Sequence, residues 1–135
     1  ILRFSNLLNF VPFVFPLACH DSKFAPIFVD ELSDFVVKSI NESKSFNKQY
    51  NLCGPKIYSL KEILEIVIKE KNRNIKVIPL SKTMSKIQAS IMEFVPGKPF
   101  SIDNFNSCQI DSICKSDHDF YSDLETIIPT YIKPN

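Results

Sequence analysis

Glycine is scarce in this chain, and its scarcity excludes one large class of binding site. Among the 135 residues, Gly54 and Gly97 are the two glycines. A turn that cradles phosphate at the start of a helix needs several glycines, because backbone N–H groups must approach the anion closely. No Gly-x-x-Gly-x-x-Gly pattern occurs. The chain therefore cannot build a dinucleotide-binding turn from its own residues.

An excess of charge of one sign is also missing. The 16 Lys and Arg residues nearly balance the 15 Asp and Glu residues, which leaves a formal net charge of +1. No basic stripe interleaved with aromatic residues is present, so we expect no nucleic-acid partner. The content of 44% hydrophobic and 12% aromatic residues is instead typical of a packed globular chain. We expect residues 1–135 to form one domain-sized unit.

The cysteines follow no metal or redox motif. None of the four forms Cys-x-x-Cys, and most stand next to apolar residues, a pattern typical of buried thiols in a reducing compartment. A metal site would need Cys108, Cys114 and His118 to converge, but their spacing matches no usual zinc pattern. We predict no metal and no secretion. Cys19 and His20 are adjacent, and adjacent side chains usually point apart, so we interpret them as buried and loop residues.

No hydrophobic run is long enough to span a bilayer. Residues 1–19 are largely apolar, but polar residues and prolines interrupt them at Arg3, Asn6, Asn9, Pro12 and Pro16. The segment also falls short of the roughly 20 apolar residues that a membrane helix needs. We predict a short helix over about residues 1–10, followed by an extended apolar loop.

Two consecutive units dominate what the sequence does contain, and each predicts a strand that runs into a helix. In the first unit, Ile27–Val29 is predicted as a short buried strand and Asp30 as the helix cap. The helix that follows carries one apolar stripe at helical spacing, formed by Leu32, Phe35, Val36, Ser39 and Ile40. Residues 41–48 are polar and predict a solvated loop.

The second unit repeats this order. Tyr50–Leu52 is predicted as a strand that Gly54 and Pro55 end. Ser59 and Glu62 then form the pattern of a capping box, in which each side chain satisfies a backbone donor of the first turn. The strongest helical stripe of the chain follows, made by Leu60, Ile63, Leu64, Val67 and Ile68. Its charged end, residues 69–73, is most simply a solvated helix terminus; phosphate binding is the weaker alternative.

The rest of the chain alternates the same two kinds of element. Ile75–Leu80 is predicted as a strand, Ser81 as the cap of a helix over 82–94, and Ser101 as the start of another short helix. Ser122 to Glu125 has the pattern of a second capping box, and the helix after it contains Pro129, which demands a kink or a helix in two pieces. The predicted class is α/β, mostly helical with a few short strands.

These patterns resemble the carboxyl-terminal half of extended short-chain dehydrogenases/reductases. That family places Val-x-Asp before one helix, and a strand, a Gly-Gly or Gly-Pro turn and (Ser/Thr)-x-x-Glu before the next. A branch that includes an accessory subunit of respiratory complex I is more similar still, with Phe-x-Pro-Val-(Tyr/Phe)-Val and a terminal Ile-Pro-x-Tyr-Leu. This chain has Phe-Ala-Pro-Ile-Phe-Val at 24–29 and Ile-Pro-Thr-Tyr-Ile at 128–132. Glu31 stands where most relatives have Asp, and we expect it to hold the start of the helix.

The resemblance implies that this chain is the substrate-side portion of a Rossmann-type protein and that a nucleotide-binding amino-terminal half is missing from it. The whole protein would bind NADP or NAD, whereas this chain alone would bind neither and no metal. No Tyr-x-x-x-Lys pair occurs, so we predict no catalytic and no cofactor-binding residue here. The implied function is an NAD(P)H-dependent oxidoreductase or epimerase-like protein. The alternative is a non-catalytic NADPH-binding scaffold or assembly subunit of a respiratory membrane complex.

A third hypothesis, a nucleotide-sugar epimerase or dehydratase, is disfavoured by two aromatic residues. Relatives of that kind carry an Arg and a His where this chain has Phe24 and Phe28, and a phenyl ring cannot make the bidentate phosphate contact of a guanidinium. The same replacement suits a pocket for a lipid-like or quinone-like molecule, for which we name Arg3, Phe24 and Phe28 as the candidate lining. A filled core is the favoured alternative.

The location implied by the resemblance is the cytoplasm or the matrix side of mitochondria, peripheral to the inner membrane. The predicted helix over 82–94 bears on this point, because its apolar stripe of Met84, Ile87, Ile91, Phe94 and Val95 is flanked by lysines. Such a helix can dock on a membrane surface or on a membrane-bound partner. Packing of the stripe onto the domain is the simpler interpretation.

Overall fold

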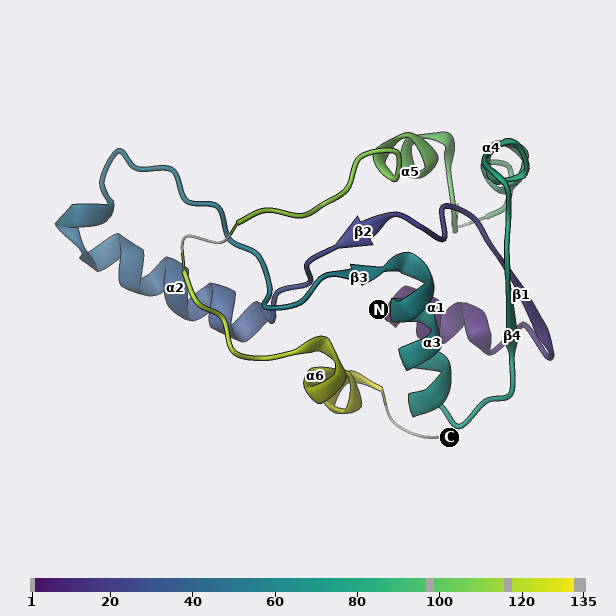
Figure 1. The fold of residues 1–135 in the computed structure, drawn as a ribbon, viewed down its shortest axis with the longest axis horizontal. Helices are drawn as coiled ribbons and strands as arrows, with labels where there is room; N and C mark the ends of the chain where they lie inside the picture. The colour runs from purple at the N-terminus through teal and green to yellow at the C-terminus, as the bar shows by residue number, and fades with distance from the viewer. Residues whose placement is uncertain (1, 97–98, 116–117, 133–135) are drawn as a thin grey trace.

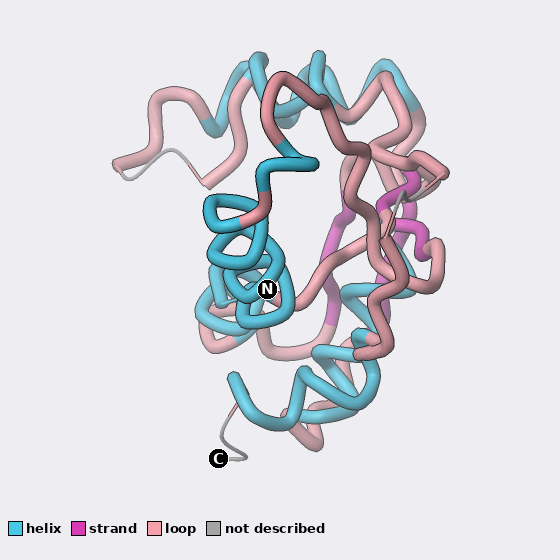
Figure 2. The backbone as a smooth tube through the Cα atoms, turned by 90° about the vertical axis from the view of Figure 1, so that its left-hand side faces the viewer, coloured by secondary structure: helices cyan, strands magenta, loops and turns pink. Residues whose placement is uncertain are grey.

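The computed structural model describes residues 2–96, 99–115 and 118–132, and the side chains from Ser5 onward. It is a mixed α/β structure in which most of the backbone is helix and loop and the strands are short (Figures 1 and 2). The elements are α1 (Leu2–Leu8), β1 (Val14–Leu17), β2 (Lys23–Phe24), α2 (Val29–Asn41), the 3₁₀ turn η1 (Ser43–Ser45), β3 (Tyr58–Ser59), α3 (Leu60–Glu70), β4 (Lys76–Pro79), α4 (Lys82–Met92), α5 (Ile102–Ser107) and α6 (Leu124–Tyr131). The predicted class is confirmed at this level.

Two small sheets hold the strands. β1 and β4 pair in parallel, with Val14 opposite Lys76 and Leu17 opposite Pro79. β2 and β3 pair antiparallel over two residues each. The strand predicted near 75–80 is therefore confirmed. The extended apolar loop predicted after residue 10 is partly wrong, because Val14–Leu17 is a strand whose partner lies some sixty residues further along the chain.

Two predicted strands are wrong. Within the described ranges, neither Ile27–Val29 nor Tyr50–Leu52 forms a strand; the first is loop that passes into α2 at Val29, and the second is loop throughout. A segment becomes a strand only when a neighbour completes its hydrogen-bond ladder. The described chain supplies such a neighbour a few residues after the predicted strand at 50–52, where Tyr58–Ser59 pairs with Lys23–Phe24.

The main core is built around α3. Four of its side chains are buried, namely Ile63, Leu64, Val67 and Ile68, and Leu64 and Val67 are fully enclosed. They form one cluster with apolar residues of α1, β1 and α6 that include Leu8, Leu17, Leu124 and Ile128. The strongest stripe in the sequence therefore does what the pattern predicts, since its whole face lies against other elements.

The charged end of α3 is solvated only in part, because Lys69 and Asn72 are exposed but Lys71 is buried. Lys71 is only 5% exposed, and its Nζ donates to Asn9 Oδ1 at 2.9 Å, to Ser5 Oγ at 3.2 Å and to the Ser5 carbonyl at 3.3 Å. Arg73 donates in the same region to the Val11 carbonyl at 3.3 Å. The last turn of a helix leaves carbonyls without intrahelical partners. The two cations tie the end of α1 to the end of α3, which the local charge pattern could not reveal.

Three of the predicted helix starts are confirmed. Ser59 and Glu62 form the expected capping box, with the Glu62 N–H donating to Ser59 Oγ at 3.2 Å and the Ser59 N–H donating to Glu62 Oε2 at 2.7 Å. Ser81 caps α4 by accepting from the Met84 N–H. Ser101 caps α5 in a second box that uses Asn104. Serine hydroxyls satisfy these otherwise unpaired donors.

Two predicted caps are wrong. α2 begins two residues earlier than expected, so that Phe28 is its N-cap and Asp30 lies inside the first turn. At α6 the N-cap is Asp123, and no capping box forms. Ser122 instead donates its Oγ to Glu31 Oε1 at 2.7 Å and its N–H at 3.2 Å. Glu31 thus holds the start of α2 against the segment before α6. Pro129 lies within α6, which runs as one helix.

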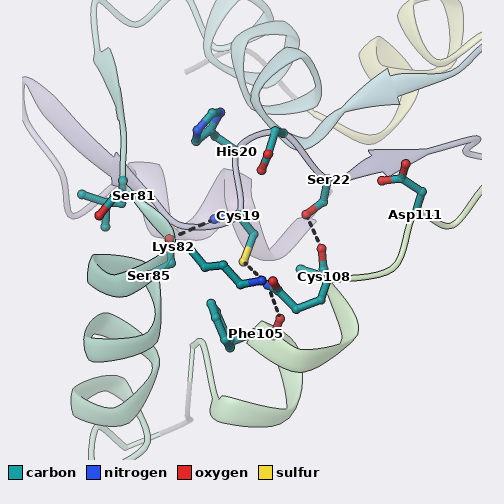
Figure 3. Close-up of a pocket in the computed structure, with 12 residues that line it drawn as sticks. Cys19, His20, Ser22, Ser81, Lys82, Ser85, Phe105, Cys108 and Asp111 are labelled. Atoms are coloured by element: carbon teal, nitrogen blue, oxygen red, sulfur yellow. Dashed lines mark hydrogen bonds between the residues drawn. The ribbon is translucent and has the colours of Figure 1, made fainter.

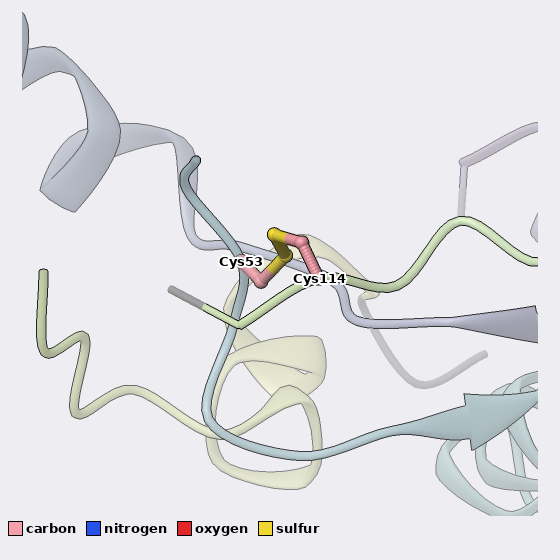
Figure 4. The surroundings of a disulfide bond; sticks show 2 residues. All are labelled: Cys53 and Cys114. Carbon is pink, nitrogen blue, oxygen red and sulfur yellow. A yellow bond between two sulfur atoms is a disulfide. The ribbon is translucent and has the colours of Figure 1, made fainter. Parts of the chain in front are cut away.

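The cysteines divide into two pairs, and for one of them the prediction of free thiols is wrong. Cys53 and Cys114 form a disulfide across 61 residues of sequence, with a Cα–Cα distance of 6.1 Å. Figure 4 shows that the bond joins two segments without regular structure. Cys19 and Cys108 are free. Sequence spacing cannot reveal which cysteines pair.

Candidate functional site

A cavity of about 260 Å³ lies where the end of β1, the start of α4 and the end of α5 meet. Twelve residues line it, and most of them are polar; those that carry its chemistry are Cys19, His20, Lys82, Ser85, Cys108 and Asp111. Figure 3 shows these side chains coming from separate segments around one space. The cavity therefore joins residues that are up to 92 positions apart in the sequence, Cys19 to Asp111.

One wall is set by the turn that follows β1. Cys19 has a φ of 52°, a left-handed conformation that is uncommon for a residue with a side chain. Its N–H donates to Ser85 Oγ at 3.3 Å, and Ser85 is 1% exposed within α4 (Figure 3). A buried hydroxyl that accepts this bond fixes the turn against the helix. The left-handed backbone of Cys19 and its bond to Ser85 place this residue at the cavity.

The other wall is set by the end of α5. Cys108 is the C-cap of this helix, and its carbonyl accepts from Ser22 Oγ at 2.6 Å (Figure 3). Three residues later, Asp111 Oδ1 accepts from the Lys23 N–H at 3.0 Å. These two bonds attach the segment after α5 to the chain around β2. Residues 19–23 are thus hydrogen-bonded both to α4 and to the segment at the end of α5.

Burial dominates the electrostatics of the two thiols. Burial above all, together with the neighbouring Cys108 and Asp21, raises the pKa of Cys19 to about 12, although Lys82 acts in the opposite direction. Burial also raises the pKa of Cys108, but there the interactions with the Cys19 thiol and with Ser22 act in the opposite direction. Both thiols are therefore protonated near neutral pH, and Cys108 is the one whose surroundings favour the thiolate more.

The structure does not bring the three predicted pocket residues to this cavity. Phe24 lies on β2, where it is half-buried against the core cluster of α3. Phe28 lies at the start of α2, with its ring in edge contact with Tyr131 at a centroid distance of 6.3 Å. Arg3 is in α1, and its side chain lies outside the described part. The lipid or quinone pocket stays a prediction.

Sequence reasoning missed the cavity because no local motif marks it. Cys19 and Cys108 are 89 positions apart, a separation calculated as 108 minus 19, and each was assigned to burial on its own. One signal was present in part, since Cys19 and His20 are adjacent and both line the cavity. The cavity forms only where the turn after β1 meets α5, and the sequence does not reveal this contact.

α4 presents a second feature, an apolar face that this chain leaves open. Met84 is 50% exposed, Ile87 46% and Ile91 59%, and Phe94 beyond the helix end is 89% exposed. The opposite face is buried through Ser85 and Ala89. The interpretation that this stripe packs onto the domain is therefore wrong for the described residues. The small residue Ala89, not the large apolar ones, packs with Phe105 of α5, and Ser85 bonds to the turn after β1.

No group of three or more His, Cys, Asp or Glu side chains is placed to hold a metal ion in the described part of the chain. Among the same residues, no helix is both long enough and apolar enough to cross a membrane.

The described residues form a mixed α/β fold that leaves apolar surface uncovered on α2 and α4. The sequence is similar to that of a known protein. No protein-family model matches the chain. It is 25% identical over 122 residues to the mitochondrial NADH dehydrogenase [ubiquinone] 1 alpha subcomplex subunit 9 of Arabidopsis thaliana. The match covers 83% of this chain and 30% of the relative. It supports, as a distant relationship, the resemblance to the complex I accessory-subunit branch.

Proposed function

We propose that this chain is the substrate-side part of an NAD(P)-binding, short-chain-dehydrogenase-like accessory subunit of a respiratory NADH dehydrogenase, and that its role there is structural. The observation that carries the proposal is the similarity to the plant complex I subunit, which extends over 83% of this chain. A relationship that spans most of the described elements concerns their common arrangement, and not one short motif.

The cofactor belongs to residues outside this chain. The described residues do not fit a dinucleotide, because Gly54 already has another use: a Cβ at that position would collide with the Pro26 carbonyl. The Gly54 N–H also donates to the Ala25 carbonyl at 3.1 Å. Gly54 therefore permits two chain segments to approach, as glycine often does, and Gly97 lies outside the described residues. NADP or NAD would bind to the nucleotide-binding half that the resemblance implies.

A structural role is favoured over turnover by what this chain exposes. Large apolar side chains are open on α4 and on α2, where Val36 is 47%, Val37 59% and Ile40 67% exposed. Exposed apolar patches of this extent mark surfaces that other elements or partners cover. A nucleotide-binding half would cover part of this surface and a subunit of the respiratory complex another part.

The test is native fractionation of the full-length gene product from its own cells, after gentle detergent extraction. We expect the protein to co-migrate with NADH dehydrogenase activity, and its depletion to reduce the amount of assembled complex without the loss of a separate NADPH-dependent activity. A protein that migrates alone in its native membranes would overturn the assignment. The variant Val77→Ala, a substitution on the half-buried side of the parallel sheet, is a control for general weakening of the fold.

Cofactor binding is tested separately. We expect the full-length protein to bind NADPH or NADH by equilibrium titration and residues 1–135 alone to bind neither. Micromolar binding to residues 1–135 would contradict the placement of the cofactor site in the other half. A full-length protein that assembles into the complex but binds no dinucleotide would preserve the structural role and remove the cofactor from it.

A further inference from the structure

The free cysteines of the cavity form a pair. Cys19 belongs to a buried cluster with Ala18, Ala89 and Phe105, and Cys108 packs against that cluster. Both residues line the same cavity. The two thiols also interact directly with one another, and the Gln109 amide lies 3.9 Å from Cys19 Sγ. Two free thiols from distant segments thus line the same open space.

We propose that Cys108 and Cys19 form a thiol–disulfide exchange site that accepts low-molecular-weight disulfides such as oxidised glutathione. The proposal concerns this cavity alone and is independent of the role proposed above. Nothing in the comparison with the plant relative concerns these cysteines.

The two cysteines have different roles because their surroundings differ. Cys108 is half-buried and Cys19 is 6% exposed, so an entering disulfide reaches Cys108 first. Burial raises the pKa of Cys108, and interactions with the Cys19 thiol and with Ser22 partly oppose that rise. The thiolate is the attacking species in exchange. Cys108 is therefore the residue that attacks, and Cys19 is the residue that resolves the product.

The exchange is balanced in two steps. The Cys108 thiolate attacks one sulfur of the small disulfide, so that a Cys108–glutathione bond forms, the glutathione S–S bond breaks and one glutathione thiolate leaves. Cys19 then loses its proton to solvent and attacks the Cys108 sulfur, which releases the second glutathione thiolate. In sum, two protein thiols are oxidised to one disulfide and one oxidised glutathione is reduced to two glutathione thiols.

Charged groups around the cavity suit this ligand. Lys82, His20, Asp21 and Asp111 all line the cavity, while glutathione itself carries two carboxylates and one ammonium group. Lys82 also lowers the pKa of Cys19, which favours the deprotonation of the resolving thiol. A ligand with charges of both signs therefore meets groups of both signs at the cavity.

The test is mass spectrometry of the full-length protein after incubation with oxidised glutathione under non-reducing conditions. Trypsin leaves Cys19 in the peptide 4–23. A second protease that cleaves before aspartate cuts at Asp111 and so separates Cys108 from Cys114. We expect a Cys19–Cys108 cross-linked peptide in the wild type and a stable glutathione adduct on Cys108 in Cys19→Ser. In Cys108→Ser, we expect adduct formation on Cys19 to be slower by about tenfold or more, because the buried thiol is less accessible.

A matched control moves the thiol by one residue. In the double variant Cys108→Ser with Ser107→Cys, the new cysteine lies on an exposed position of α5 outside the cavity. We expect it to take up glutathione without transferring to Cys19. Cross-linking to Cys19 from this position, or equal reactivity of Cys19 and Cys108 in the wild type, would overturn the proposal. So would a cross-link that appears only in urea, and circular dichroism of each variant establishes that the fold is retained.

Discussion

Two helices with the same kind of sequence have opposite environments in this molecule. α2 and α3 each carry a regular apolar stripe, yet α3 buries four of its residues and α2 buries none. α2 lies at one end of the long axis, away from the cluster formed by α1, α3 and α6 (Figure 1). Its inner contacts are aromatic, with the Phe35 ring 5.3 Å from that of Tyr50 and 5.0 Å from that of His118.

The difference teaches what an amphipathic pattern determines. The stripe specifies that a helix forms and which face is apolar, but it does not specify that this chain covers the face. α3 is covered because α1 and α6 fold back on it. α2 is held at its start by Glu31 and in its middle by the aromatic contacts of Phe35, and the described residues leave its remaining apolar surface open.

The largest expected effect tests burial itself. Leu64 is fully enclosed in α3, so Leu64→Ala should lower the free energy of unfolding by about 4 kcal/mol through lost contacts and a residual cavity. Val36→Ala on the exposed face of α2 should lower the free energy of unfolding by less than about 1 kcal/mol in the protein separated from its partners. Urea unfolding of the full-length protein measures both. Equal costs would remove the distinction between the two helices.

The next effect concerns the disulfide between Cys53 and Cys114. Cys53 precedes α3 in the chain, and Cys114 lies in the loop between α5 and α6. Replacing both by serine should lower the free energy of unfolding by about 3 kcal/mol, because the closed loop no longer restricts the unfolded chain. Hydrogen exchange should rise more in α2 than in α3. Equal increases in both helices would show that the link does not act on α2 in particular.

A smaller effect concerns how α3 begins. Ser59→Ala should cost about 1 kcal/mol by removing the cap, whereas Ser90→Ala on the exposed side of α4 should cost almost nothing. The bonds from the Ser59 backbone and side chain lower the pKa of Glu62 below its usual 4.5. Its contribution is therefore full above that value and is lost as the pH falls through the lowered pKa. The stability difference between wild type and Glu62→Gln should shrink over that acid range.

Three of the five predicted helix starts are confirmed, whereas the caps predicted at Asp30 and Ser122 are wrong. The capping box at Ser59, the cap at Ser81 and the start of α5 at Ser101 depend on contacts within three residues, and all three are present. Strands were predicted less well, because a strand depends on its partner. Val14–Leu17 gained one in β4, whereas Tyr50–Leu52 has no ladder partner among the described residues.

The candidate site was beyond local reasoning for the same physical reason. The pairing of Cys53 with Cys114, the cavity between Cys19 and Cys108, and the burial of Lys71 against α1 all join segments more than sixty residues apart. None of these contacts has a spacing rule in one sequence. The mixed α/β class could be inferred because it depends on the number and order of elements, which patterns do reveal.

The smallest expected effect on stability carries the most information about function, and it lies within one helix. Ile87→Glu with Ile91→Glu changes the open face of α4, so the free energy of unfolding should change by less than about 0.5 kcal/mol. On the role proposed above, the same double variant should release the full-length protein from membranes or from the respiratory complex in sedimentation, since two carboxylates oppose an apolar contact flanked by Lys82 and Lys86. The dinucleotide binding expected under that proposal should stay unchanged. Ala89→Glu, on the fully buried side of the same helix, is the matched control and should destabilise the fold. A double variant that unfolds like Ala89→Glu would place Ile87 and Ile91 in a core instead of a docking surface.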